Sequence, residues 1–139
     1  MEERRTETGG PSPIQAAAAA LARGDAAYLA PDGRRALIVE AHLDDAEREA
    51  RSARAKAEGL RRVPRLDGLA AWRIRADFVA ERVAHPTVKR RLGKTLRPPR
   101  GRQRFSRALA CHPGVKRAVG AFARDALEAH VRAWLASAP

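Results

Sequence analysis

The chain has very little cysteine and no long apolar run. Its 139 residues include one cysteine, Cys111, so no disulfide can form within the chain. Proteins that lack disulfides are typical of reducing compartments, which predicts a cytoplasmic location. The apolar run 16–22 is far shorter than the roughly 20 residues that cross a bilayer, and no basic segment directly precedes it. We therefore expect neither a membrane span nor a signal peptide.

Aromatic residues are also scarce, which limits the ways in which the protein could bind bases. The chain has six of them: Tyr28, Trp72, Phe78, Phe105, Phe122 and Trp134. The tryptophans and phenylalanines fall on apolar stripes of expected helices, which predicts that all five pack in the core. Because buried aromatic rings cannot stack on bases, this distribution argues against a platform for single-stranded nucleic acid.

Acidic residues are missing from one long stretch. Residues 82–117 contain twelve Lys or Arg and no Asp or Glu. The other 103 residues hold 16 basic and 16 acidic side chains, so the whole net charge of +12 comes from this stretch. Arg outnumbers Lys 24 to 4, as GC-rich codon usage would explain, but that bias does not remove Asp and Glu. The stretch therefore predicts a surface that attracts polyanions.

Sequence motifs that are typical of catalytic or ligand-binding sites are missing as well. The chain contains no Gly-rich phosphate loop, nucleophile elbow or zinc motif. His42 lies near Asp44 and Asp45, but Asp44 is explained more simply as a helix cap. Cys111 has no histidine at a suggestive spacing and is expected to be a small buried residue. We therefore predict no catalytic residue, no metal site and no cofactor.

The remaining pattern predicts a mainly helical α+β fold with one small β-hairpin. We expect a disordered tail over residues 1–13 and a single domain over 14–139. The hairpin is expected at about 27–41, where a Pro-Asp-Gly turn precedes the β-branched Ile38 and Val39. It is the only convincing β-structure, and residues 60–66 are interpreted as a linker. Because a lone hairpin is marginally stable, we expect it to pack on C-terminal helices, with the helical core at about 67–136.

Residues that typically begin or end helices define the bounds of the expected helices. Asp44 and Asp67 are each followed by a helical pattern and are expected to cap it, while Gly24 and Gly59 are expected to end the preceding helices. The expected helices cover residues 14–23, 44–58, 68–84 and 115–136, with short helices near 88–96 and before His112.

Two of these helices carry the apolar stripes that define the expected core. Apolar residues recur at three- and four-residue steps in both, which predicts core-facing helices. The first stripe contains Leu69, Trp72, Ala76, Val79 and Val83, and the second contains Val115, Val119, Phe122, Ala126, Leu127, Val131 and Trp134.

Short motifs between residues 26 and 136 are similar to those of a known family. Gly101-Arg102-Gln103-Arg104-Phe105 matches a glycine, basic and Phe element, and Phe122-Ala123-Arg124-Asp125 with Trp134-Leu135 matches a closing element. The segment 28–33 is similar to an N-terminal hairpin. The pattern resembles the UPF0158 family of small bacterial proteins of uncharacterised function, although Val119 replaces a family Trp and Ser106-Arg107 replaces Lys-Asp. The resemblance implies an α+β fold of helices with a small sheet, and it implies no activity.

The basic stretch supplies the functional prediction. We predict non-catalytic, sequence-tolerant binding to the phosphate backbone of nucleic acid, with duplex DNA or structured RNA as the expected polyanion. The alternatives are an adaptor module that binds an acidic protein partner and a basic surface that is merely solvated. The residues expected to contact phosphates are Arg90, Arg91, Lys94, Arg97, Arg100, Arg102, Arg104 and Arg107.

Overall fold

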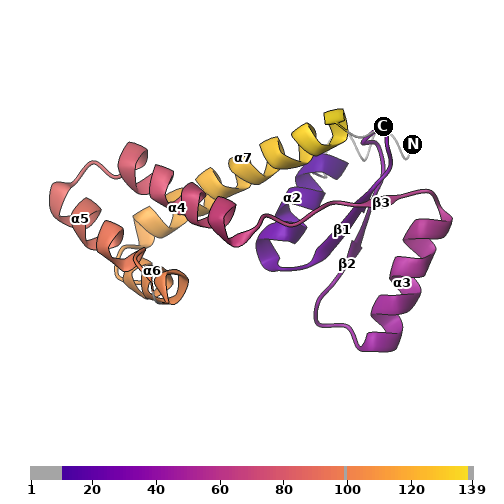
Figure 1. Ribbon diagram of the computed structural model, residues 1–139, viewed down its shortest axis with the longest axis horizontal. Helices are drawn as coiled ribbons and strands as arrows, with labels where there is room; N and C mark the ends of the chain where they lie inside the picture. The colour runs from indigo at the N-terminus through magenta and orange to yellow at the C-terminus, as the bar shows by residue number, and fades with distance from the viewer. Residues whose placement is uncertain (1–10, 99, 138–139) are drawn as a thin grey trace. The chain divides into compact units, whose positions relative to one another are not determined.

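A computed structural model describes residues 11–98 and 100–137 of the chain. In this part the chain forms six helices and a three-stranded sheet, which confirms the predicted mainly helical α+β class (Figure 1). Most of the predicted disordered tail lies outside the described residues. The elements are α2 (Pro13–Arg23), β1 (Ala26–Leu29), β2 (Ala36–Val39), α3 (Asp45–Ala57), β3 (Arg61–Arg62), α4 (Gly68–Arg82), α5 (Pro86–Thr95), α6 (Gly101–Leu109) and α7 (Pro113–Ser137).

The chain divides into two compact units. Unit 1 contains residues 11–65 and 127–137, and unit 2 contains Leu66–Ala126. The 25-residue helix α7 contributes its first turns to unit 2 and its last turns to unit 1. The apolar stripe predicted on this helix therefore contributes residues to both units.

The caps in unit 1 follow the sequence signals closely. Ser12 and Gln15 form a reciprocal capping box at the start of α2, and Gly24 ends that helix in the left-handed region at φ 91°. The Asp44 side chain accepts the Glu47 N–H at the start of α3, which confirms its role as a cap. These bonds satisfy backbone groups that a helix end leaves without intrahelical partners.

The predicted hairpin is confirmed, with β1 and β2 antiparallel and β2-β1-β3 as the strand order. The third strand is a correction, because residues 60–66 were interpreted as a linker. Two consecutive arginines carry no alternating or β-branched pattern that would predict a strand. Backbone pairing alone defines it, with Tyr28 opposite Arg62 and Leu29 opposite Arg61.

The sheet of unit 1 is covered by α2 and α3, which Figure 1 shows on opposite sides of it. Helix α2 buries Ala17, Ala18 and Ala20, whose small side chains allow a close approach to the strands. On the other side Ala55 of α3 is fully buried in a cluster with Tyr28, Val39 and Leu60. The other residues of α3 are exposed or partly exposed, in keeping with its charged sequence.

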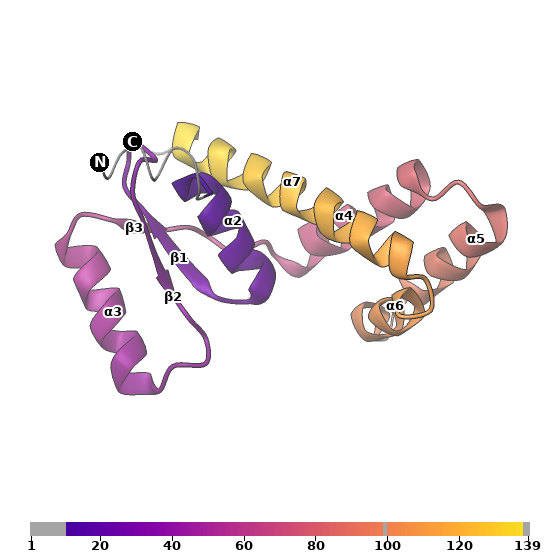
Figure 2. The same ribbon diagram turned by 180° about the vertical axis from the view of Figure 1, so that it is seen from behind.

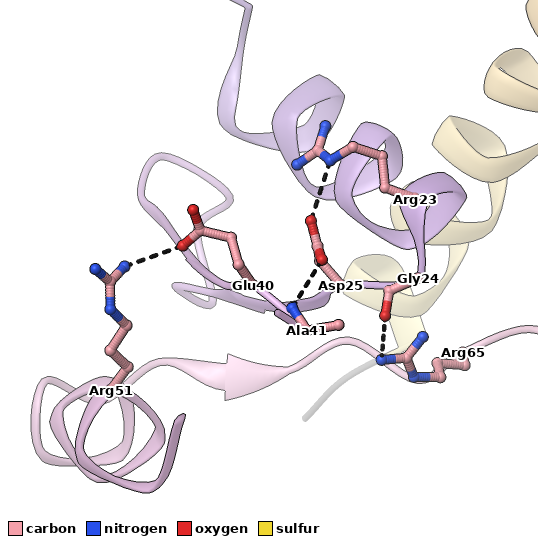
Figure 3. Close-up of polar contacts among 7 residues, drawn as sticks. All are labelled: Arg23, Gly24, Asp25, Glu40, Ala41, Arg51 and Arg65. Carbon is pink, nitrogen blue, oxygen red and sulfur yellow. Dashed lines mark hydrogen bonds and ion pairs between the residues drawn. The ribbon is translucent and has the colours of Figure 1, made fainter. Parts of the chain in front are cut away.

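Asp25 ties the end of α2 to the hairpin (Figure 3). Its carboxylate accepts the Ala41 N–H at 2.9 Å and the Arg23 Nε–H at 3.0 Å. Arg65 closes the same corner by donating to the Gly24 carbonyl at 3.0 Å. The Ala41 N–H, with the Arg23 guanidinium adding to it, lowers the pKa of Asp25 below its ordinary value of 3.8, although burial opposes this shift.

We expect Asp25→Asn to lower the free energy of unfolding by about 1 kcal/mol at neutral pH, because the amide keeps the acceptor but loses the charge. The folded-state pKa of Asp25 is depressed, so its stabilisation is complete above the ordinary, unfolded pKa of 3.8 and disappears as the pH falls through the folded value. Urea unfolding of both proteins across this range should show the gap closing in acid. A gap that persists unchanged to the lowest pH would contradict the assigned role.

Unit 2 is a small helical assembly built around Phe78. Phe78 is 1% exposed, and its ring meets Phe122 of α7 edge to face with centroids 5.5 Å apart. The other buried members of this core are Val79, Val83, Leu92, Leu96, Phe105 and Leu109. The core therefore takes residues from α4, α5, α6 and the first turns of α7.

The stripe predicted on α4 is only partly correct. Val79 and Val83 are buried, but Leu69 and Trp72 are 65% and 43% exposed. The helix instead buries Phe78, which the stripe left at its flank. Trp72 stays exposed beside this core, so the prediction that it is a core residue was wrong.

Candidate nucleic-acid interface

The two units carry very different charges. Unit 2 contains 15 basic and 4 acidic residues, a net charge of +11 out of +12 for the chain. The rest of the chain, residues 1–65 and 127–139, contains 13 basic and 12 acidic residues. A small helical unit with this imbalance produces a positive local potential.

Helices α5 and α6 direct their basic residues outward because their apolar residues hold the opposite faces in the core. On α5, Leu92 is fully buried while Arg90, Arg91 and Lys94 are exposed. On α6, Phe105 and Leu109 are buried. The exposed basic residues of α6 are Arg102, Arg104 and Arg107.

The segment between α5 and α6 places two more predicted site residues, Arg97 and Arg100, in exposed positions. Figure 2 shows α6 lying next to α5, and the two helices are in contact. Arg100 has φ 60°, in the left-handed region that costs a non-glycine residue about 1–2 kcal/mol. Gly101 follows it, and a Cβ there would lie 2.7 Å from the Leu96 carbonyl oxygen. The structure thus brings all eight predicted residues onto α5, α6 and the segment that joins them.

Ion pairs distinguish the two units further. Within the described ranges, every ion pair lies in unit 1, as in Arg54 with Glu58 at 2.8 Å and Arg51 with Glu40 at 3.2 Å. None of the eight predicted site residues has a carboxylate partner among the residues that the structure describes. Their charges are therefore available to a ligand.

Helix ends add to the positive potential. Over the described part of the chain, neither α5 nor α6 has a side-chain cap at its start or an acidic residue in its first turn. The partial positive charge of each helix N-terminus is therefore left uncompensated beside basic side chains. This arrangement favours an anion over a neutral ligand.

No family model, curated protein or solved structure matches this chain. The resemblance to the UPF0158 family therefore stays a prediction.

Among the described helices none is both long and apolar enough to cross a membrane. The described residues also contain no cluster of His, Cys, Asp or Glu that could hold a metal ion. Cys111 is exposed, so the prediction that it is buried was wrong.

Sequence reasoning missed the contribution of α4 to this basic region. Arg75 of α4 lies close to Arg102 of α6, and burial, with the Arg102 charge adding to it, lowers the pKa of Arg75. Arg73 on the same helix is exposed. The acid-free stretch could not reveal either residue, because Asp77 and Glu81 separate them from it in the sequence.

Unit 1 offers a different kind of site, an open hollow of about 450 Å³ beside β2. Its arginines are compensated by carboxylates, as Figure 3 shows for Arg23 with Asp25 and for Arg51 with Glu40. The remaining arginines of the hollow, Arg35 and Arg54, both pair with Glu58. Three carboxylates thus offset four arginines, which leaves the hollow far less charged than unit 2, and we assign it no function.

Proposed function

We propose that unit 2 binds nucleic acid through the phosphate backbone, without catalysis and without sequence preference. The proposed contacts are made by Arg90, Arg91, Lys94, Arg97, Arg100, Arg102, Arg104 and Arg107. The observation that carries the proposal is that these eight side chains are exposed and lack carboxylate partners among the described residues. Arginine suits this role because its planar guanidinium forms paired hydrogen bonds with phosphate oxygens.

The distribution of the basic residues favours contact with phosphates over recognition of base edges. The basic side chains are spread over two helices and the segment between them, so no one helix carries them all. Contacts spread in this way follow a backbone and release counterions without reading a sequence. Specificity for one base sequence is therefore not part of the proposal.

A salt titration tests the proposal. We expect the protein, stripped of co-purifying nucleic acid, to bind labelled DNA or RNA with micromolar or tighter affinity in fluorescence anisotropy at low salt. If six to eight phosphates are neutralised, affinity should fall by about three to four orders of magnitude between about 50 and 200 mM salt. Equal affinities for unrelated sequences of one length would support sequence tolerance.

Two outcomes would contradict the proposal. The first is no binding to any nucleic acid at low salt, which would mean that the basic surface is covered or merely solvated. The second is stronger binding to an acidic polypeptide such as polyglutamate than to nucleic acid of equal charge. That result would favour the adaptor alternative.

A further inference from the structure

Trp72 is the feature of unit 2 that phosphate binding does not explain. It remains 43% exposed, and with Leu69 it forms the pair of large apolar side chains that stay exposed in the described part of the chain. The two lie three residues apart, on adjacent turns of one face of α4. Exposing a tryptophan forgoes the stabilisation that its burial would give, so a partner that covers the ring would recover it.

The indole of Trp72 is held in one orientation. Its Nε1–H donates to the Leu96 carbonyl oxygen at 3.0 Å, at the C-terminal end of α5. This bond satisfies the polar edge of the ring, and it fixes the ring beside the segment that carries Arg97. An aromatic ring that is both exposed and immobilised costs little further entropy when another flat group stacks on it.

Two arginines adjoin the residues that position this ring. Arg97 directly follows the residue whose carbonyl Trp72 binds. Arg75 lies one helical turn after Trp72 on α4 and close to Arg102 of α6. A ligand that stacks on the ring would therefore find guanidinium groups within reach for its phosphates.

We propose that the nucleic acid bound by unit 2 is single-stranded and that one of its bases stacks on Trp72. This inference rests on the proposed function and refines it, because duplex DNA keeps its bases paired and unavailable to the ring. Guanidinium groups together with an aromatic ring are a combination that binds single strands, in which phosphates meet the charges and a base meets the ring. The expectation of a duplex rested on all five tryptophan and phenylalanine rings being in the core, and the exposure of Trp72 removes that premise for this ring.

Fluorescence of Trp72 tests the inference directly. In a Trp134→Phe background Trp72 is the sole tryptophan, and the phenylalanine keeps a ring beside Arg61. Oligothymidylate of about 12 nucleotides should quench its emission saturably, whereas a duplex of equal length and inorganic polyphosphate should not. Quenching by the base-bearing single strand alone would support stacking.

Substitutions separate stacking from the structural role of the ring. Trp72→Ala should weaken binding of the single strand about ten- to hundred-fold and change duplex binding little. Trp72→Phe keeps a stacking ring but loses the bond to Leu96, so it should retain most of the affinity. Circular dichroism and thermal melting of each variant would establish that unit 2 remains folded. Loss of affinity in both variants to an equal degree would overturn stacking in favour of a structural role.

The outcomes for the two proposals are distinct. Binding of both nucleic acids without quenching, or tighter binding to the duplex, would overturn the role of Trp72 and leave backbone binding intact. Absence of binding to either nucleic acid would overturn the proposed function and this inference with it. Quenching by polyglutamate in place of nucleic acid would assign the surface to an acidic protein and overturn both.

Discussion

Replacing Arg97, Arg100, Arg102 and Arg104 with glutamine is expected to weaken nucleic-acid binding about 10²- to 10³-fold at roughly 0.1 M salt. Each phosphate contact that is lost also removes its share of counterion release. The slope of log affinity against log salt should therefore fall by about 3. Anisotropy titrations at several salt concentrations measure both effects in one series.

The variant should remain folded, because none of the four residues is buried and each substitution relieves repulsion between like charges. Arg100 and Arg104, for example, are four residues apart at the start of α6. A matched control removes the same charge from exposed positions of unit 1, with glutamine at Arg34, Lys56, Arg62 and Arg132. If the control loses as much affinity as the test variant, net charge and not this surface governs binding.

Gly101→Ala is expected to destabilise unit 2 by about 1–3 kcal/mol, the usual cost of overpacking. A Cβ at this position would lie 2.7 Å from the oxygen and 3.1 Å from the carbon of the Leu96 carbonyl. Both atoms belong to the backbone, so the connection between α5 and α6 would have to open. The same carbonyl accepts the indole N–H of Trp72, so the ring should lose its fixed orientation as well.

Gly93→Ala provides the matched control for this substitution. Gly93 lies inside α5, and a Cβ there would meet nothing within 4 Å. Alanine should therefore stabilise the helix by about 0.5–1 kcal/mol. Chemical unfolding followed by circular dichroism compares the two variants, and Gly101→Ala melting at or above the wild-type temperature would show that the contact is easily relieved.

Sequence reasoning recovered the parts of this fold that local chemistry determines. Ser12 was not singled out, but Gly24, Asp44 and Asp67 mark helix ends as expected because each satisfies backbone groups within its own turn. The Pro-Asp-Gly turn likewise fixes the hairpin through its own backbone preferences. The eight basic site residues were also predictable as exposed, since charged side chains avoid burial without partners.

Features that depend on distant contacts could not be predicted in this way. Strand β3 exists because β1 offers an open edge to pair with, and its own residues, Arg61 and Arg62, carry no strand signal. Helix α4 offers two apolar faces, and the structure buries the one with Phe78 and Val79 while Trp72 stays exposed. Periodicity identifies the apolar faces of a helix but does not show which of them is buried, because burial depends on the residues of the neighbouring helices.

The division of α7 between the two units has a consequence for synthesis on the ribosome. Unit 1 begins with residues made early, yet it also needs residues 127–137, where Val131 is fully buried and His130 bonds to the Pro64 carbonyl at 2.7 Å. Unit 2 is one continuous segment, Leu66–Ala126, and all of it is translated before those residues appear. The early strands therefore lack this part of α7 until the whole of unit 2 has been translated. The nascent chain would thus expose its basic part before its charge-balanced part is complete.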